Sequence, residues 1–213
     1  LANTAINTQR ETFRESDVVR VHGIISNGGA SVNAIPGEVI YDGRVRAKSI
    51  ETLEPIAEKV IRCYRAGALA MGASVEVQSI AGYHGLVQDP TMQKLFVDNA
   101  ELVLGRDSIS VVGTSQTHGG STDMGDLSTI MPVIHPYANS ASGVGHGNDY
   151  LIEDYDRAVV APAKVMTATV LDLLGNDAQA AREALAKSKP AMTAEQYVSV
   201  QRGRFKTELF EQS

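Results

Sequence analysis

Two loops concentrate the side chains that could do chemistry in this chain. The run HGGSTDMGDLSTIMPVIHPY, residues 118–137, holds two histidines, two aspartates and three glycines. The run GHGND, residues 145–149, places His146 between two glycines, where an imidazole is easy to approach. Such a histidine suits a metal ligand or a proton shuttle, although from the local sequence alone a solvated loop histidine is the simpler interpretation.

Other groups in the first loop could support a site. Its glycines would let the backbone come close to a ligand. Asp123 and Asp126 could orient a metal-bound imidazole or cap a helix, and capping is the favoured role for Asp126. A zinc site needs three or four protein ligands, and no HxxxH, HxD or CxxC pair occurs in the sequence. The motifs therefore do not build a complete metal site.

Composition narrows the class of protein. The 213 residues carry a formal net charge of −6, which argues against a nucleic-acid or anionic-membrane partner held by bulk electrostatics. No apolar run approaches the length needed to span a bilayer. Cys63 is the only cysteine, so no internal disulfide can form and a reducing, cytoplasmic location is expected. We interpret Cys63 as a small buried helix residue rather than a reactive thiol.

The elements expected to position these loops form two parts that differ in their patterns of apolar residues. The first part has strand alternation and helical spacing typical of an α+β layer, with Pro55 in the first turn of its long helix. The expected elements are a helix tail at 2–9, strands at 18–25, 38–47 and 73–83, and a helix at 50–71. The second part is expected to contain helices at 90–104 and 155–174, a strand at 130–135, and a helical tail at 177–213 broken at Pro190, with Thr193 as a new cap.

Three segments in order resemble one enzyme family. GGASVNAIPGEVIYDGRVRA resembles the lid-domain signature of the metal-dependent amidohydrolases and peptidases that include aminoacylase, carboxypeptidase G and aminobenzoyl-glutamate hydrolase. GSTDMGDLSTIMPVIHPY is similar to the segment before that family's last metal ligand, and VGHGNDYLIEDYDRA to its closing loop. The resemblance covers roughly residues 1–174, and the joint occurrence of three motifs makes chance unlikely.

The resemblance also implies what the chain lacks. The family's early His-x-Asp motif, bridging acid and Glu-Glu pair would lie before Leu1, so the chain is expected to be a C-terminal portion that is inactive alone. His146 would supply one ligand to a divalent metal, zinc with manganese or cobalt as alternatives, at a site of two ions in the full-length enzyme. The metal would polarise an amide carbonyl and activate water.

The resemblance assigns substrate contacts as well. Arg46 would hold a carboxylate and Asn33 would donate to an amide oxygen. Without the resemblance, a solvated strand arginine and a turn-forming asparagine are the favoured interpretations. His135 and Ser121 would face the substrate, and Asp123 would support the metal-bound imidazole. The substrate would be an N-acyl amino acid, a dipeptide or an aminobenzoyl-glutamate-like amide.

The expected fold class is α/β with an α+β lid. Residues 1–82 would form a ferredoxin-like lid and dimerisation layer lacking its first strand. Residues 83–176 would form the C-terminal part of a zinc-peptidase-like α/β catalytic domain with an incomplete parallel sheet, and residues 177–213 a helical extension. A homodimer is expected through residues 50–80, because a lid sheet has open edges. A non-catalytic lid-type binding module and an unrelated metabolic domain are the alternatives.

Overall fold

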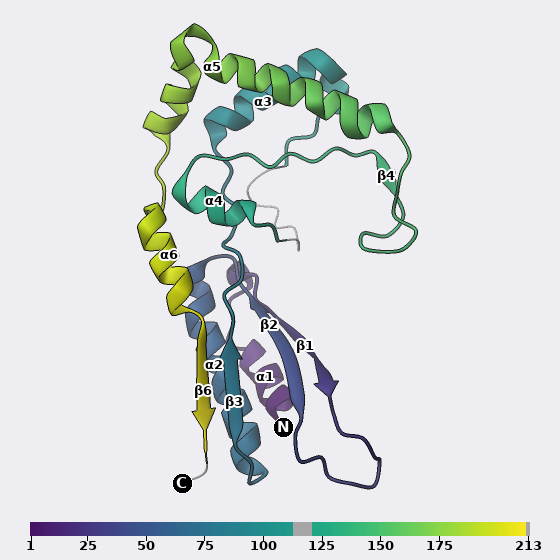
Figure 1. Cartoon of the computed structure of the whole chain (residues 1–213), viewed down its shortest axis with the longest axis vertical. Coiled ribbons are helices and arrows are strands. Elements are labelled where there is room, and N and C mark those ends of the chain that lie inside the picture. The colour runs from purple at the N-terminus through teal and green to yellow at the C-terminus, as the bar shows by residue number, and fades with distance from the viewer. Residues whose placement is uncertain (113–120, 212–213) are drawn as a thin grey trace. The chain divides into compact units, whose positions relative to one another are not determined.

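A computed structural model of the chain describes residues 1–112 and 121–211 (Figure 1). The chain divides into two compact units. The first unit comprises Leu1–Gly85 and the C-terminal segment from Ser199, and the second comprises Leu86–Val198. Helices and small antiparallel sheets make up both units, so the chain has a mixed α/β structure.

The first unit follows the expected order of elements closely. Helix, hairpin, helix and strand all occur near the predicted bounds. The elements are α1 (Ala2–Arg10), the 3-10 turn η1 (Glu15–Asp17), β1 (Arg20–Asn27), β2 (Ile40–Arg46), α2 (Ile50–Ala70), β3 (Val75–Ser79), the end of α6 (Ala194–Gly203) and β6 (Lys206–Phe210).

The β1–β2 hairpin is antiparallel, and its alternation separates two faces. Val21 pairs with Val45 and both belong to the core, while the neighbouring pair Arg20 and Arg46 lies on the opposite face. A loop of residues 28–39 joins the strands. Gly29 has a φ of +107° in this loop, and a Cβ there would lie 3.1 Å from Pro36, so the turn favours glycine.

The core of the first unit lies between the hairpin and the two helices. Ile6, Val21, Val60 and Cys63 are its buried members. Burial raises the pKa of the Cys63 thiol, which keeps the sulfur protonated. The interpretation of Cys63 as a structural residue is confirmed.

Helix α2 begins at the predicted residue, but Pro55 lies at a different position in the helix from the one predicted. Ser49 is its N-cap, and the Ser49 hydroxyl accepts a hydrogen bond from the Thr52 N–H at 3.3 Å. The predicted first-turn position of Pro55 is wrong, because the helix begins at Ile50 and Pro55 is an interior residue. Pro55 has no N–H group, so the helix lacks one backbone hydrogen bond there. The helix tolerates this loss because Ile56 and Val60, in the turn that follows, are buried in the core.

The C-terminal segment departs from the expected all-helical tail. Strand β6 pairs antiparallel with β3, from Val75 opposite Phe210 to Ser79 opposite Lys206. The Arg65 guanidinium lies over the Phe210 ring, 4.1 Å from its centroid. A pairing between residues more than 120 positions apart leaves no local signal in the sequence, whereas the predicted cap at Thr193 is local and is confirmed by its bond from the Gln196 N–H.

The second unit is helical with few paired strands. It contains α3 (Pro90–Leu104), the 3-10 turn η2 (Arg106–Ser108), α4 (Met124–Ile130), β4 (Ala141–Ser142), β5 (Leu151–Ile152), the π-helical turn η3 (Asp156–Val160) and α5 (Ala161–Lys187). Helix α3 has the predicted bounds, with Asp89 as N-cap. Helices α3 and α5 pack together, burying Val165 and Thr169, and the Asn99 amide donates to the Asp172 carboxylate at 2.7 Å.

The strand predicted at 130–135 is wrong. Helix α4 extends to Ile130, and the residues that follow are extended without joining a sheet. Pro132 and Pro136 lack the N–H groups that a ladder needs. The segment is held by the bond from the Asp89 N–H to the Val133 carbonyl, 2.8 Å, and by the bond from the His135 N–H to the Gln88 side chain, 3.0 Å. Among residues 1–112 and 121–211 all strand pairs are antiparallel, so the expected parallel sheet is absent there.

The expectation that no apolar segment is long enough to span a bilayer is wrong for one helix. Within the described residues, Asp156–Lys187 is long and apolar enough, by length and composition alone, to cross a membrane. Its backbone leaves the helical conformation from Gly175 to Ala178. The buried Val165 and Thr169 and the Asp172–Asn99 bond instead place one face of α5 against α3 in a folded unit.

Candidate functional site

The first candidate group lies at the start of α4. The Thr122 hydroxyl accepts from the Met124 N–H at 3.3 Å, and the Thr122 carbonyl accepts from the Gly125 N–H at 3.1 Å. The helix therefore begins around Asp123, which occupies the N-cap position. The cap predicted at Asp126 is wrong, since Asp126 lies inside the first turn. Ser121 is exposed beside this turn.

Helix α4 is fixed by its own small and hydroxyl residues. Gly125 is buried, and its carbonyl accepts from the hydroxyls of Ser128 at 2.7 Å and Thr129 at 3.1 Å. The Ser128 hydroxyl also accepts from the Val87 N–H at 3.1 Å. Gly125 is thus a buried residue in the first turn of α4, and Asp123 remains on the exposed side of the turn.

His135 follows α4 in the extended segment. Its backbone N–H donates to the Gln88 side chain at 3.0 Å, and its ring meets Tyr137 edge-on, with centroids 5.0 Å apart. The Nδ1 atom of His135 is buried and has no hydrogen-bond partner in the part of the chain that the structure describes. A buried ring nitrogen without a partner costs free energy, so this atom is suited to a group that the described residues do not supply.

His146 stands at the tip of a short hairpin. Strands β4 and β5 pair Ala141 with Ile152 and Ser142 with Leu151, and His146 lies midway between them, exposed. Its backbone has a φ of +67°, the left-handed region that non-glycine residues rarely adopt. Strained backbone of this kind persists only where the surroundings impose it.

The turn around His146 is imposed by its neighbours. The Gly147 N–H donates to the Val144 carbonyl at 2.7 Å, closing a tight turn. A Cβ on Gly143, which has a φ of +88°, would lie 2.3 Å from the Asp149 carbonyl oxygen. Both glycines therefore leave room for a backbone path that presents the imidazole outward.

The described residues do not bring together a metal site by themselves. No group of three or more His, Cys, Asp or Glu side chains that could hold a metal ion occurs among the described residues. No hydrogen bond joins Asp123 or His135 to His146 within that part of the chain. His146 can supply at most one ligand, and its predicted role stays a prediction.

Asn33 and Arg46 lie in the first unit. Asn33 is exposed in the β1–β2 loop, where its side-chain oxygen accepts from the Ser31 hydroxyl. The Asn33 amide N–H groups are the ones left to donate. Arg46 ends β2 on the face that Arg20 shares, and it is partly buried. Their substrate contacts remain predictions, and His118, Gly119 and Gly120 lie outside the described residues.

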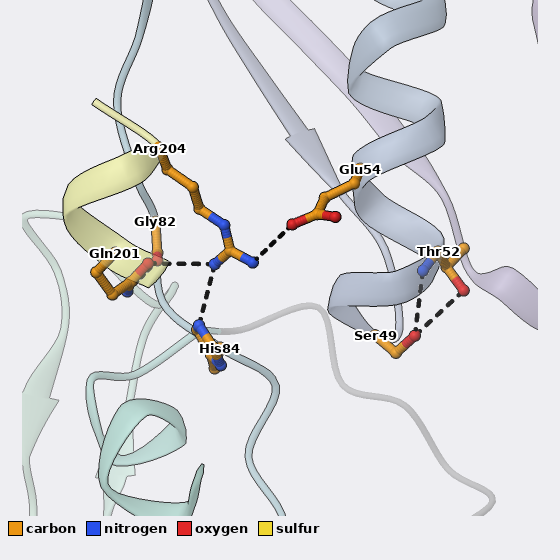
Figure 2. A network of polar contacts seen from close by, with 7 residues as sticks. All are labelled: Ser49, Thr52, Glu54, Gly82, His84, Gln201 and Arg204. Atoms are coloured by element: carbon orange, nitrogen blue, oxygen red, sulfur yellow. Dashed lines mark hydrogen bonds and ion pairs between the residues drawn. The ribbon is translucent and has the colours of Figure 1, made fainter. Parts of the chain in front are cut away.

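A polar network in the first unit had no signal in the sequence (Figure 2). The Arg204 guanidinium contacts three partners: Glu54 at 3.1 Å, the His84 ring at 3.0 Å and Gln201 at 3.2 Å. His84 is buried, and Gln201 also donates to the Gly82 carbonyl at 3.3 Å. These contacts tie α6 to α2 and to the segment after β3, so the network is structural.

Comparisons relate the chain to peptidases and hydrolases. No family model matches it. The chain is 32% identical over 182 residues to the Xaa-Arg dipeptidase of Mus musculus, covering 82% of this chain and 41% of that protein. It is 34% identical over 163 residues to the Xaa-Arg dipeptidase of Homo sapiens, covering 73% of this chain and 37% of that protein. An uncharacterized hydrolase of Sinorhizobium fredii is 28% identical over 110 residues, 51% of this chain and 26% of that protein.

These relatives support the hydrolase part of the sequence-based prediction. The chain is a distant homologue of enzymes that include dipeptidases. It spans less than half of the length of the dipeptidases that it matches. The amidohydrolase family, the metal and the dimer stay predictions from the sequence.

Proposed function

We propose that the chain forms part of a metal-dependent dipeptidase that hydrolyses the peptide bond of a dipeptide with a cationic C-terminal residue. The observation that carries this proposal is the 32% identity, across 182 residues, to an Xaa-Arg dipeptidase. The formal net charge of −6 suits a cationic substrate, since an acidic surface raises its local concentration.

Residues of this chain would serve substrate binding more than bond cleavage. Arg46 offers a planar fork of donors for the C-terminal carboxylate of a dipeptide. Asn33 has amide donors that suit the carbonyl oxygen of the scissile bond. His135 would donate or accept through its unpartnered Nδ1, and Ser121 would contribute a hydroxyl from its exposed position.

The metal would be held mainly by groups outside the described residues. Those residues contain no ligand cluster, so they do not fit a metal site alone. His146 would contribute one imidazole, with Asp123 as its support. In the complete enzyme we expect zinc, with manganese or cobalt as alternatives, and the cytoplasm as the location.

The exposed area of the chain supports a larger parent protein. The solvent-accessible surface is 15,246 Å² for a mass of 22.7 kDa. Two separate compact domains of half this mass each would expose only about 11,500 Å² in total. Large apolar side chains such as Ile35, Leu102 and Leu171 are among those left exposed. Such surface is expected where a chain packs against further parts of the same enzyme.

The test is hydrolysis by the product of the complete open reading frame. We expect a free dipeptide ending in arginine to be cleaved, activity to fall on chelation, and zinc, manganese or cobalt to restore it. The same dipeptide ending in alanine is the matched control for the cationic residue and should be cleaved more slowly. Failure of the metal-loaded full-length protein to cleave any dipeptide would contradict the proposal.

A further inference from the structure

The face of the β1–β2 hairpin that points away from the core gathers positive charge. Val21 and Val45 belong to the opposite face, which packs in the core, and Tyr41 on that same face lies against Tyr64 of α2. Because side chains alternate along a strand, the remaining positions face away from α2. They are occupied by Arg20, His22 and Ile24 in β1, and by Asp42, Arg44 and Arg46 in β2. The whole chain has a formal net charge of −6, so this concentration of arginine is local.

The register of the hairpin places two of these arginines directly opposite each other. Arg20 pairs with Arg46 across the ladder. Side chains in this relation have Cβ atoms about 5 Å apart, and like charges there destabilise an antiparallel pair. Arg44 is two residues from Arg46 along β2, a distance of about 7 Å, and it is the diagonal neighbour of Arg20. Long side chains reach across such distances, so the three guanidinium groups can converge on one ligand.

Among the described residues, nothing neutralises Arg20 and Arg44. Both side chains are exposed, and neither guanidinium group has a hydrogen bond or an ion pair in that part of the chain. Asp42 is the carboxylate of this face, but it stands opposite Ile24, at the far end of the face from Arg20. Asp42 forms no ion pair with Arg44 in the described structure. The positive charge of the two arginines is therefore open to a ligand.

Opposed arginines in a strand ladder conflict with the local rules of sheet stability. Such conflicts are expected at functional sites, where a residue is retained although it does not favour the fold. An anion among the guanidinium groups would replace their repulsion by charge-assisted hydrogen bonds. Each planar guanidinium also presents a fork of donors that fits two oxygens of one phosphate or carboxylate group. The face therefore has the chemistry of an oxyanion site.

The number and spacing of the arginines set the charge of the ligand. A monovalent ion such as chloride can neutralise one guanidinium group and would leave the others opposed. A phosphate group, or two carboxylates on one short molecule, can contact guanidinium groups on both strands. We propose that Arg20, Arg44 and Arg46 bind a small oxyanion with at least two negative charges on this face of the hairpin. The inference goes beyond the proposed function, which uses Arg46 alone among these three arginines.

Thermal unfolding of the 213-residue chain with added anions tests the site. Inorganic phosphate and glutarate are the two probes, since they carry their charge on one phosphate group and on a pair of carboxylates. In a buffer of low ionic strength, we expect a rise in Tm of a few degrees beyond that given by sodium chloride at equal ionic strength, because a ligand of the folded state stabilises it. The probe with the larger shift identifies the oxyanion that the site prefers. Shifts no larger than those with sodium chloride for both probes would overturn the inference.

Charge-matched variants locate the binding. Arg20→Gln and Arg44→Gln each remove one charged donor and should weaken the affinity for the preferred probe about tenfold. Arg62→Gln makes the same change of charge at an exposed position of α2, which packs on the other side of the hairpin, and should bind like the unaltered chain. Equal affinities in all three variants would mean that the probe responds to net charge alone, and would overturn the inference.

The stability of the variants without a multivalent anion provides a second measurement. Arg20→Gln removes the repulsion opposite Arg46, so its Tm should equal or exceed that of the unaltered chain at low ionic strength. A Tm for Arg20→Gln that lies below that of Arg62→Gln would show that Arg20 serves the fold, and would contradict the inference. Neither measurement uses dipeptide hydrolysis, so the inference and the proposed function can fail independently.

Discussion

The two units of the chain differ in what holds their polar residues in place. In the first unit, a buried cluster around Val60 and two strand ladders fix the hairpin and α2. In the described residues of the second unit, the β4–β5 ladder has two residue pairs, and α3 and α5 pack against each other. The candidate residues His135 and His146 lie on the irregular segments between those helices. Chemistry-bearing side chains therefore concentrate where regular structure is sparse.

The largest expected effect on stability is at the contact between α3 and α5 in the second unit. Val165 is 1% exposed, so Val165→Asp buries an unpaired charge between α3 and α5. We expect a loss of about 3–5 kcal/mol in the stability of that unit. Urea unfolding followed by amide exchange should show the second unit opening while β1 and β2 keep their protection. Val170→Asp, at a position 49% exposed on the same helix, is the control and should cost little. Equal losses in both units would show that they unfold together.

The first unit can be weakened at the Arg204 network. Arg204→Ala removes bonds to Glu54, His84 and Gln201 and leaves the buried His84 ring without that donor. The expected loss is about 1–3 kcal/mol, with faster amide exchange in β6 and β3. Arg202→Ala changes an exposed residue of α6 two positions before Arg204. This variant should leave the stability and the amide exchange of β6 and β3 unchanged. Unaltered exchange in β6 for the Arg204 variant would mean that strand pairing alone holds the C-terminus.

The smallest expected effect is at the start of α2. Ser49→Ala removes the side chain that accepts from the Thr52 N–H, and about 1 kcal/mol should be lost. Ser49→Asp keeps an acceptor at the cap and should retain most of the stability. Thermal unfolding of the three proteins measures the difference, and identical curves would show that water replaces the cap without cost.

The first unit was largely predictable because its signals are local. Alternation in β1 and β2, the helical spacing of Ile56, Val60 and Cys63, and the turn at Gly29 each lie within a few residues. The pairing of β6 with β3 and the Arg204–His84 contact were not, since each joins positions more than 100 residues apart.

The second unit and its candidate site were predictable only in part. Helix α3 carries its own cap and proline, and was predicted to the residue. The segment after α4 looked like a strand because its apolar residues are β-branched, but Pro132 and Pro136 deprive it of ladder bonds. The glycines beside His146 made it a candidate in the sequence. Its left-handed backbone was not predicted, because it depends on the turn closed by the bond between Gly147 and Val144.

The most direct test of the account is the metal content of the full-length gene product with His146→Ala. If His146 is one of about four ligands, the variant should lose most of the metal at that position. Hydrolysis should then fall by orders of magnitude. His22→Ala, on the exposed face of β1, is the control and should retain both metal and activity. Full metal occupancy with normal turnover in the His146 variant would contradict the account and leave His146 as a solvated loop residue.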